Sequence, residues 1–90
     1  MDEHKPPKQL SKELNEAKQK VVEGGTYVHY KHPAKTYKIV QVAVLEATDE
    51  VAVVYRAQYG EGFTFVRTLR EWLELVDWEG KTVSRFTHVD

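Results

Sequence analysis

The chain contains no cysteine, so a disulfide scaffold and a cysteine-based zinc or redox site are both excluded. Long apolar runs are also missing, since none approaches the ~20 residues that a membrane-spanning helix requires. The first nine residues are polar, carry two prolines and lack the apolar region of a secretion signal. We therefore expect a soluble, cytoplasmic protein that makes no contact with a membrane.

A large excess of charge of either sign is absent as well. The 13 basic and 14 acidic residues give a net charge of −1, so the bulk attraction of a basic protein to nucleic acid is not present. The charges are unevenly placed, because residues 24–45 hold three lysines and no acid, whereas residues 46–90 hold nine acids and five basic residues. The sequence thus indicates one local basic edge in a protein that is not basic overall.

The length of 90 residues suffices for one domain. A domain of this size buries only ~60% of the surface of its unfolded chain, so the core needs most of the large apolar side chains. We divide the chain into a flexible tail with an N-terminal helix over residues 1–23 and a small β domain over residues 24–90. We expect residues 1–9 to be disordered and the helix to start with Ser11 as its N-cap and to stop at the two glycines after residue 23. Its apolar stripe is thin, so we expect loose docking or fraying.

After these glycines the composition is that of strands. Four segments are rich in Val, Ile, Tyr, Phe and Thr, namely TYVHYK, TYKIVQVAVLEA, VAVVYRAQY and FTFVRT. The breaks between them, HPAK, ATDE and GEG, have the composition of turns. Thr68-Leu-Arg-Glu71 is a capping box that starts a short helix, and a last hairpin turns at Glu79-Gly80.

These elements predict a mainly β fold. Five to six strands with tight turns form a small antiparallel SH3-like barrel or a strongly bent sheet, with one short helix and the N-terminal helix. The alternative is an open sheet with the N-terminal helix packed across one face.

The hairpin over residues 53–67 carries four aromatic rings and two arginines. If Tyr59 pairs with Phe63, alternation along the strands places one set of side chains on one face. These are Tyr55, Ala57, Tyr59, Phe63, Phe65 and Arg67. We expect this face to be core, with Arg67 at its rim and satisfied by Glu71, Glu74 or Asp77. In the alternative, the face is exposed and Arg67 clamps a carboxylate or phosphate of a ligand.

Catalytic motifs are lacking. His29 and His32 are three residues apart on a strand and its turn, not four apart on a helix, so we expect no metal site. No serine lies in a nucleophile elbow, and the glycines form neither a P-loop nor a dinucleotide-binding pattern. We therefore predict that the protein is not an enzyme and has no catalytic residues and no cofactor.

Two classes of function remain. The first is a non-catalytic interaction module that binds a protein or peptide partner through loops or an edge strand. The second is an SH3-like domain that binds RNA or another nucleic acid through the acid-free segment GTYVHYKHPAKTYKIV. A protein that binds a small ligand or acts on one is the weakest alternative. The predicted binding residues are Tyr30, Lys31, Tyr37, Lys38 and Arg67. We expect three of them, Tyr30, Lys31 and Arg67, to lie together at the mouth of the barrel, in a monomer or weak dimer.

Four runs of residues, YVHYK, VVYRAQYG, FVR and GKTVSRF, resemble a bacterial family of small proteins, the domain-of-unknown-function family numbered 1653. The resemblance covers residues 24–88 and implies the kind of domain but no activity. Typical members have histidine, serine and glutamate where this chain has Leu45–Ala47, and they have tryptophan and proline at Phe65 and Thr68. If that histidine-containing segment were catalytic, this chain would lack it.

Overall fold

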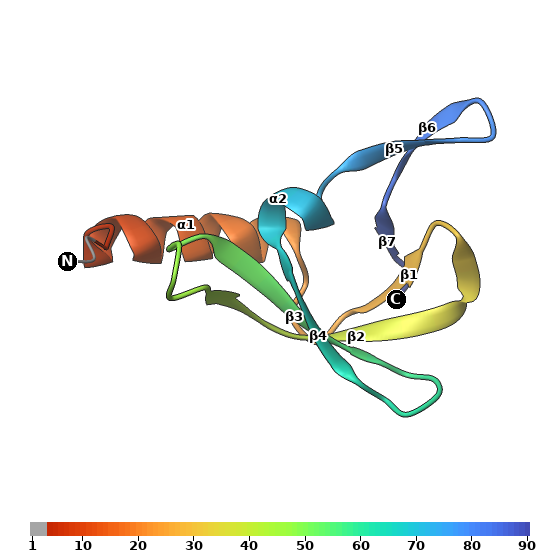
Figure 1. Cartoon of the computed structure of the whole chain (residues 1–90), viewed down its shortest axis with the longest axis horizontal. Helices are drawn as coiled ribbons and strands as arrows, with labels where there is room; N and C mark the ends of the chain where they lie inside the picture. Colours follow the sequence, from red (N-terminus) through yellow and green to blue (C-terminus); the bar gives the residue numbers. More distant parts are fainter. Residues whose placement is uncertain (1–3) are drawn as a thin grey trace.

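The computed structural model of the protein describes residues 4–90 and shows a mainly β fold, as predicted (Figure 1). The elements in chain order are α1 (Pro7–Lys20), β1 (Thr26–His29), β2 (His32–Val44), β3 (Val51–Ala57), β4 (Thr64–Thr68), α2 (Leu69–Trp72), β5 (Leu75–Trp78), β6 (Lys81–Ser84) and β7 (Phe86–His88). Five strands form an antiparallel sheet in the order β4-β3-β2-β1-β7, and β5 and β6 form a separate two-stranded sheet. Neither helix in this part of the chain is long and apolar enough to cross a membrane.

The five-stranded sheet is strongly bent but open. Phe86 lies on β7 at one edge of the sheet, yet its ring centroid is 5.7 Å from that of Tyr55 on β3. Since β1 and β2 separate these two strands, the contact requires the sheet to curl across its face. Within residues 4–90 the edge strands β4 and β7 share no ladder, because the chain leaves the sheet between them to form the β5–β6 arm (Figure 1). The described residues therefore form the strongly bent sheet of the prediction and no closed barrel, with seven strands instead of five to six.

Both helices pack on the same side of the sheet and enclose the core. The buried apolar cluster consists of Ala17, Val21, Tyr27, Ile39, Val42, Val51, Val53, Tyr55, Trp72 and Phe86. Each of the larger side chains contributes about 1.5–3 kcal/mol by its removal from water. The alternative arrangement, an open sheet with α1 across one face, is thus closer to the fold than the barrel.

The start of α1 differs from the prediction. The helix begins at Pro7, with Pro6 as its N-cap, so Ser11 is an exposed residue inside the helix and caps nothing. Proline suits the first helical turn because the N–H groups there have no partner within the helix. The C-terminal half docks firmly, since Ala17 and Val21 are fully buried. The expected loose docking is therefore wrong for this half of the helix.

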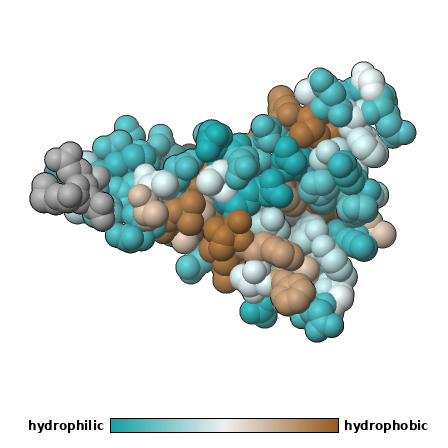
Figure 2. Space-filling view, in the orientation of Figure 1, coloured by the Kyte–Doolittle hydropathy of each residue, from teal (hydrophilic) through white to brown (hydrophobic). Residues whose placement is uncertain are grey.

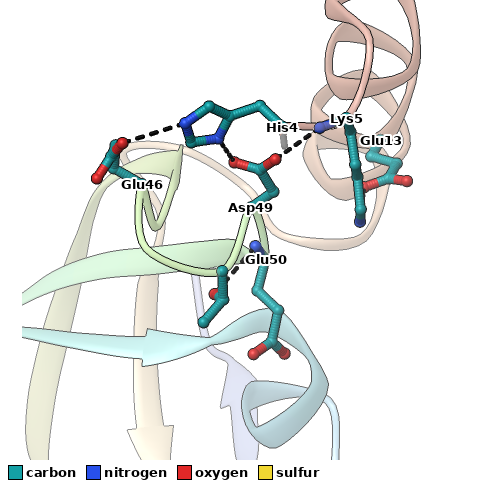
Figure 3. A network of polar contacts seen from close by, with 7 residues as sticks. His4, Lys5, Glu13, Glu46, Asp49 and Glu50 are labelled. Carbon is teal, nitrogen blue, oxygen red and sulfur yellow. Dashed lines mark hydrogen bonds and ion pairs between the residues drawn. The ribbon is translucent and has the colours of Figure 1, made fainter. Parts of the chain in front are cut away.

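The residues just before α1 are held by the loop between β2 and β3 (Figure 3). His4 Nδ1 is 2.7 Å from a carboxylate oxygen of Asp49, and the backbone N–H of Lys5 donates to the other oxygen at 2.6 Å. His4 Nε2 lies 3.2 Å from a carboxylate oxygen of Glu46. The predicted disordered tail is thus wrong for residues 4–9. Its first three residues lie outside the described part of the chain.

The turn between the first two strands is also displaced from the prediction. It lies at Tyr30 and Lys31, and the segment HPAK, predicted as the turn, belongs to β2. His29 pairs with His32, whereas the preceding Val28 pairs with Thr36, so three residues of β2 bulge out of the ladder. Proline is tolerated at such a bulge because no ladder hydrogen bond needs its N–H.

The β3–β4 hairpin keeps the predicted faces with a different register. Phe63 lies opposite Ala57 and not opposite Tyr59 as predicted, and Tyr55 pairs with Phe65. This shift of two residues leaves every side chain on its predicted face. Gly60 and Gly62 take φ values of 56° and 69° in the turn, where residues with a Cβ would be strained.

Two further local predictions are confirmed. The last hairpin turns at Glu79 and Gly80, with φ values of 52° and 80°. The capping box starts α2, because the hydroxyl of Thr68 accepts a hydrogen bond from the N–H of Glu71 at 3.2 Å.

Candidate functional site

The ring of Phe86 is the centre of a cluster to which five elements contribute. It is stacked on Trp72 of α2 with a centroid distance of 3.8 Å and an interplanar angle of 6°. It meets His29 of β1 at 5.2 Å and Tyr37 of β2 at 6.1 Å, both edge-on, in addition to Tyr55 of β3. Such edge-to-face and stacked pairs stabilise beyond the burial of area, by about 0.5–1.5 kcal/mol each. Phe86 therefore holds rings from four other elements in one cluster.

Arg67 on β4 lies against this ring and lacks the partners that the sequence suggested. Its guanidinium carbon is 5.5 Å from the Phe86 centroid, and its Nε is buried with no hydrogen-bond partner. The three carboxylates predicted to satisfy it hydrogen-bond to other residues: Glu71, Glu74 and Asp77. Within the described residues Arg67 makes no ion pair, so no carboxylate of this part of the chain neutralises its charge.

A second arginine, Arg85, has a buried Nε in the same condition. Its Nη2 donates to a carboxylate oxygen of Glu74 at 2.6 Å, but its Nε has no hydrogen-bond partner. Two backbone bonds hold the residue in place, because its N–H donates to the carbonyl of Glu74 and its carbonyl accepts from the N–H of Tyr30. Arg85 is thus a fixed residue whose guanidinium is only partly used.

The charges of both arginines act on His29. Its pKa is lowered first by burial and then by the positive charges of Arg85, Arg67, His32 and Lys31, so the ring is neutral at pH 7. Nδ1 of His29 accepts a hydrogen bond from the N–H of Lys31 at 3.2 Å. The neutral ring therefore carries its proton on Nε2, where it is a donor.

The predicted residues Tyr30 and Lys31 are connected to this cluster through His29. The ring of Tyr30 lies 4.5 Å from that of His29 and 5.2 Å from that of Trp78, and Lys31 Nζ lies 5.8 Å from the Tyr30 ring. A chain of ring contacts thus runs from Tyr30 through His29 and Phe86 to Arg67.

The other two predicted residues lie on opposite faces of β2. Tyr37 faces the cluster, and its hydroxyl is 2.6 Å from that of Tyr59; burial and this hydrogen bond raise its pKa. Lys38 is the next residue on the strand and is exposed on the other face, where it pairs across the ladder with Arg56. The structure therefore separates Lys38 from the remaining predicted residues.

The aromatic face of the β3–β4 hairpin is only partly core. Tyr55 and Ala57 are buried as predicted, and Arg67 is half-buried, whereas Phe63 just before β4 and Phe65 on β4 are exposed, at 62% and 40%. The reason is that β4 is an edge strand, so no element covers its outer side. Figure 2 shows apolar side chains gathered where β3 and β4 overlap in this view and towards their hairpin.

Two surface hollows lie elsewhere, along α1. One of about 510 Å³ is lined by residues of α1 alone, and one of about 260 Å³ lies between α1, the start of β3 and α2. Charged groups that line the second hollow already pair, Lys5 with Glu13 at 3.0 Å and Arg70 with Glu50 at 3.3 Å. Neither hollow is lined by Phe86 or Arg67. No group of three metal-ligating side chains comes together among residues 4–90.

His29, Arg85 and Phe86 are not among the binding residues that the sequence predicts. The sequence signal for these residues was that they lie in the runs YVHYK and GKTVSRF. These two runs are far apart in the chain, but the pairing of His29 with Phe86 makes them neighbours in the sheet. We refer to Arg67, Arg85, His29 and Phe86 together as the arginine site.

Comparisons with known proteins agree with the fold. Residues 25–88, which include the whole arginine site, match the family described as protein of unknown function (DUF1653). The crystal structure of a DUF1653 protein from Bordetella bronchiseptica is similar, with a TM-score of 0.67 and 35% sequence identity, covering 78% of this chain and 90% of that one. No curated protein matches the chain. The extent of the family match, together with the shared fold, shows that this chain belongs to the DUF1653 family.

Proposed function

We propose that this protein is a non-catalytic binding module that takes an extended segment of a protein or peptide partner as an additional strand on β4. The observation that carries the proposal is the free edge of β4, which ends the sheet and, among residues 4–90, pairs with β3 alone. We regard the fold as an SH3-like sheet left open between β4 and β7, which leaves this edge accessible. Strand addition is a general mode of peptide recognition, in which main-chain hydrogen bonds supply affinity and side-chain contacts supply specificity.

The hydrogen-bond pattern tells which backbone groups of β4 point outward. The N–H of Ala57 donates to the carbonyl of Phe63 at 2.9 Å. In an antiparallel ladder every second pair is hydrogen-bonded, so on β4 Phe65 and Arg67 also direct their backbone groups towards β3. The N–H and C=O groups of Thr64 and Val66 therefore point away from β3. These groups supply the donors and acceptors that an incoming strand needs.

The side chains of β4 support the same function. Natural edge strands are usually protected by prolines, lysines, bulges or a covering element. β4 has the sequence TFVRT, without proline or lysine, and Val66 is 56% exposed. Phe63, Phe65 and Arg67 alternate on one face, so a partner strand would place its own side chains beside two rings and a guanidinium.

The test is a selection of random eight-residue peptides displayed on phage, followed by titration of the selected peptides against two variants. Val66→Pro removes one outward N–H but no hydrogen bond of the β3–β4 ladder, so the protein folds. We expect Val66→Pro to bind the selected peptides about tenfold more weakly. The variant loses one main-chain hydrogen bond to the peptide, and the proline ring displaces the peptide strand. Val66→Thr keeps the N–H and the β-branched shape, and we expect affinity within about threefold of the original.

The proposal fails if no peptide is selected, or if Val66→Pro binds the selected peptides as well as Val66→Thr does. Thermal unfolding of both variants checks that the fold is retained.

A further inference from the structure

We propose that the arginine site binds a carboxylate group of the partner segment, held by Arg67 and Arg85 beside Phe86 and His29. The identity of the ligand as a peptide rests on the proposed function, whereas the affinity of the site for a carboxylate can be measured without it.

The first argument is the pair of buried donors without acceptors. Buried polar groups in folded proteins are nearly all hydrogen-bonded, and an unmet buried donor costs about 1–3 kcal/mol. Here the Nε atoms of two arginines are buried without a partner. The guanidinium carbon of Arg67 lies 5.5 Å from the ring of Phe86, the residue that follows Arg85 in the chain. A carboxylate that reached both guanidinium groups would accept hydrogen bonds from donors that the described residues leave unused.

The second argument is the kind of groups that are free. Arg67 and Arg85 offer only N–H donors, and the neutral His29 adds the N–H of its Nε2, because its Nδ1 already accepts from a backbone N–H. A site with donors alone selects a ligand group that is an acceptor alone. Arginine forks match the planar geometry of a carboxylate in particular.

The third argument is the net charge, which distinguishes a carboxylate from a phosphate. Glu74 neutralises Arg85 at 2.6 Å, and His29 is uncharged, so the site has an excess of about one positive charge, that of Arg67. A carboxylate carries one negative charge, whereas a phosphate monoester carries about −1.5 to −2 at pH 7. The balance favours the carboxylate.

The position of the site on the sheet agrees with a bound strand. Arg67 follows Phe65 by two residues on β4, so its side chain lies on the face that carries the two exposed rings. A partner strand on β4 would bring its C-terminal carboxylate or an acidic side chain to this point.

The experiment is a titration of the unaltered protein with acetate at about pH 6.5, followed by the NMR signals of the arginine Nε–H groups. We expect saturable shifts of the Arg67 and Arg85 signals, with Kd in the millimolar range. Acetamide, which has the same shape without the charge, and sodium chloride at equal ionic strength should cause none. Arg56 on the opposite face is the internal control, since its signal should not saturate.

Substitution tests the fork as distinct from the charge. Arg67→Lys keeps the charge but removes the planar donors, and we expect acetate to bind about tenfold more weakly while Arg56→Lys binds as the unaltered protein does. The inference is overturned if the unaltered protein shows no saturable shift, if inorganic phosphate binds more tightly than acetate, or if Arg67→Lys binds acetate unchanged.

Peptides selected against the protein identify the source of the carboxylate. Amidation of the C-terminus weakens binding if the terminal carboxylate is held, and Glu→Gln or Asp→Asn in the peptide weakens it if a side chain is held. If neither weakens binding, the inference is overturned while strand addition stands. If acetate binds but no peptide is selected, the proposed function fails and the carboxylate site remains.

Discussion

Asp49 connects two distant parts of the chain through a single side chain. It has a φ of 61°, a left-handed conformation that aspartate and asparagine adopt more readily than other residues with a Cβ. This turn directs its carboxylate, which is 8% exposed, towards His4 and the N–H of Lys5 (Figure 3). The hydrogen bond and charge of Asp49 raise the pKa of His4, and the hydrogen bonds from His4 and Lys5 lower the pKa of Asp49. The attachment of the residues before α1 is therefore sensitive to pH.

We predict that this attachment is strongest between about pH 3.8 and 6.5, the ordinary pKa values of the two groups. Because the pKa of Asp49 is lowered in the folded state, its contribution is present above the ordinary value and is lost as the pH falls through the lowered value. Because the pKa of His4 is raised, its contribution is complete below the ordinary value and is lost as the pH rises through the raised one. The protection factor of the Lys5 amide against hydrogen exchange measures the attachment.

The control is Asp49→Asn, which fits the same backbone conformation but has no charge. Its Lys5 protection should be lower and flat over this pH range. A profile identical to that of the unaltered protein would contradict the role of Asp49.

At the scale of the elements, α1 is divided into an exposed first half and a docked second half. Leu14 is partly buried, and Ala17 and the C-cap residue Val21 are in the core. The helix contacts β2 and β3 on the side of the sheet that also holds α2. Its amphipathic pattern alone did not reveal this, because alanine is too small to signal a buried position in a sequence.

We predict that deletion of residues 1–20 lowers the free energy of unfolding by about 2–4 kcal/mol, because it uncovers core side chains on β2 and β3. The truncated protein should still unfold cooperatively, since the sheet, α2 and the Phe86 cluster remain. Deletion of residues 1–10 removes the first turn and the two partners of Asp49 but leaves Ala17 and Val21 in place, so it should cost less than the longer deletion. Urea unfolding followed by Trp72 fluorescence measures both. Equal losses for the two deletions would show that the docked half of α1 contributes nothing.

At the scale of the whole molecule, the basic residues do not form one continuous surface. Lys38 and Arg56 lie on one face of the sheet, and Arg67 lies on the other. Lys35 Nζ lies 5.0 Å from the ring of Tyr59, at the hairpin end of the same ladder. The local basic edge in the sequence is therefore divided by the alternation of β2.

We predict that mixed-sequence single-stranded RNA binds weakly and with a shallow salt dependence, equivalent to fewer than about two phosphate contacts. The basic residues are divided between the two faces of the sheet, so few phosphates are neutralised at once. Fluorescence anisotropy of labelled RNA over a range of salt concentrations measures this slope. A steep slope would favour the nucleic-acid alternative over the peptide-binding module.

Much of the fold was predictable where neighbours in the sequence decide the structure. The capping box at Thr68, the turn at Glu79 and Gly80, and the faces of the β3–β4 hairpin all depend on residues within a few positions of each other. The site was predictable only in part. Arg67 was identified as a site residue from the strand face that it shares with two phenylalanines. Its lack of a hydrogen-bond partner was not predicted, because the three carboxylates near it in the sequence accept hydrogen bonds from other residues.

The sequence by itself determined the mainly β class, the turns with special backbone angles and the side of each strand on which a residue lies, because these follow from local sterics and the two-residue period of a strand. The tertiary structure decided which residues meet across the bend. The chain leaves the sheet after β4, forms the β5–β6 arm and returns beside β1, and this path brings Phe86 onto Trp72 and Arg67. Phe86, Trp72 and Arg67 lie on different elements, and their contacts depend on how those elements pack. A pattern of neighbouring residues in the sequence does not encode such long-range packing.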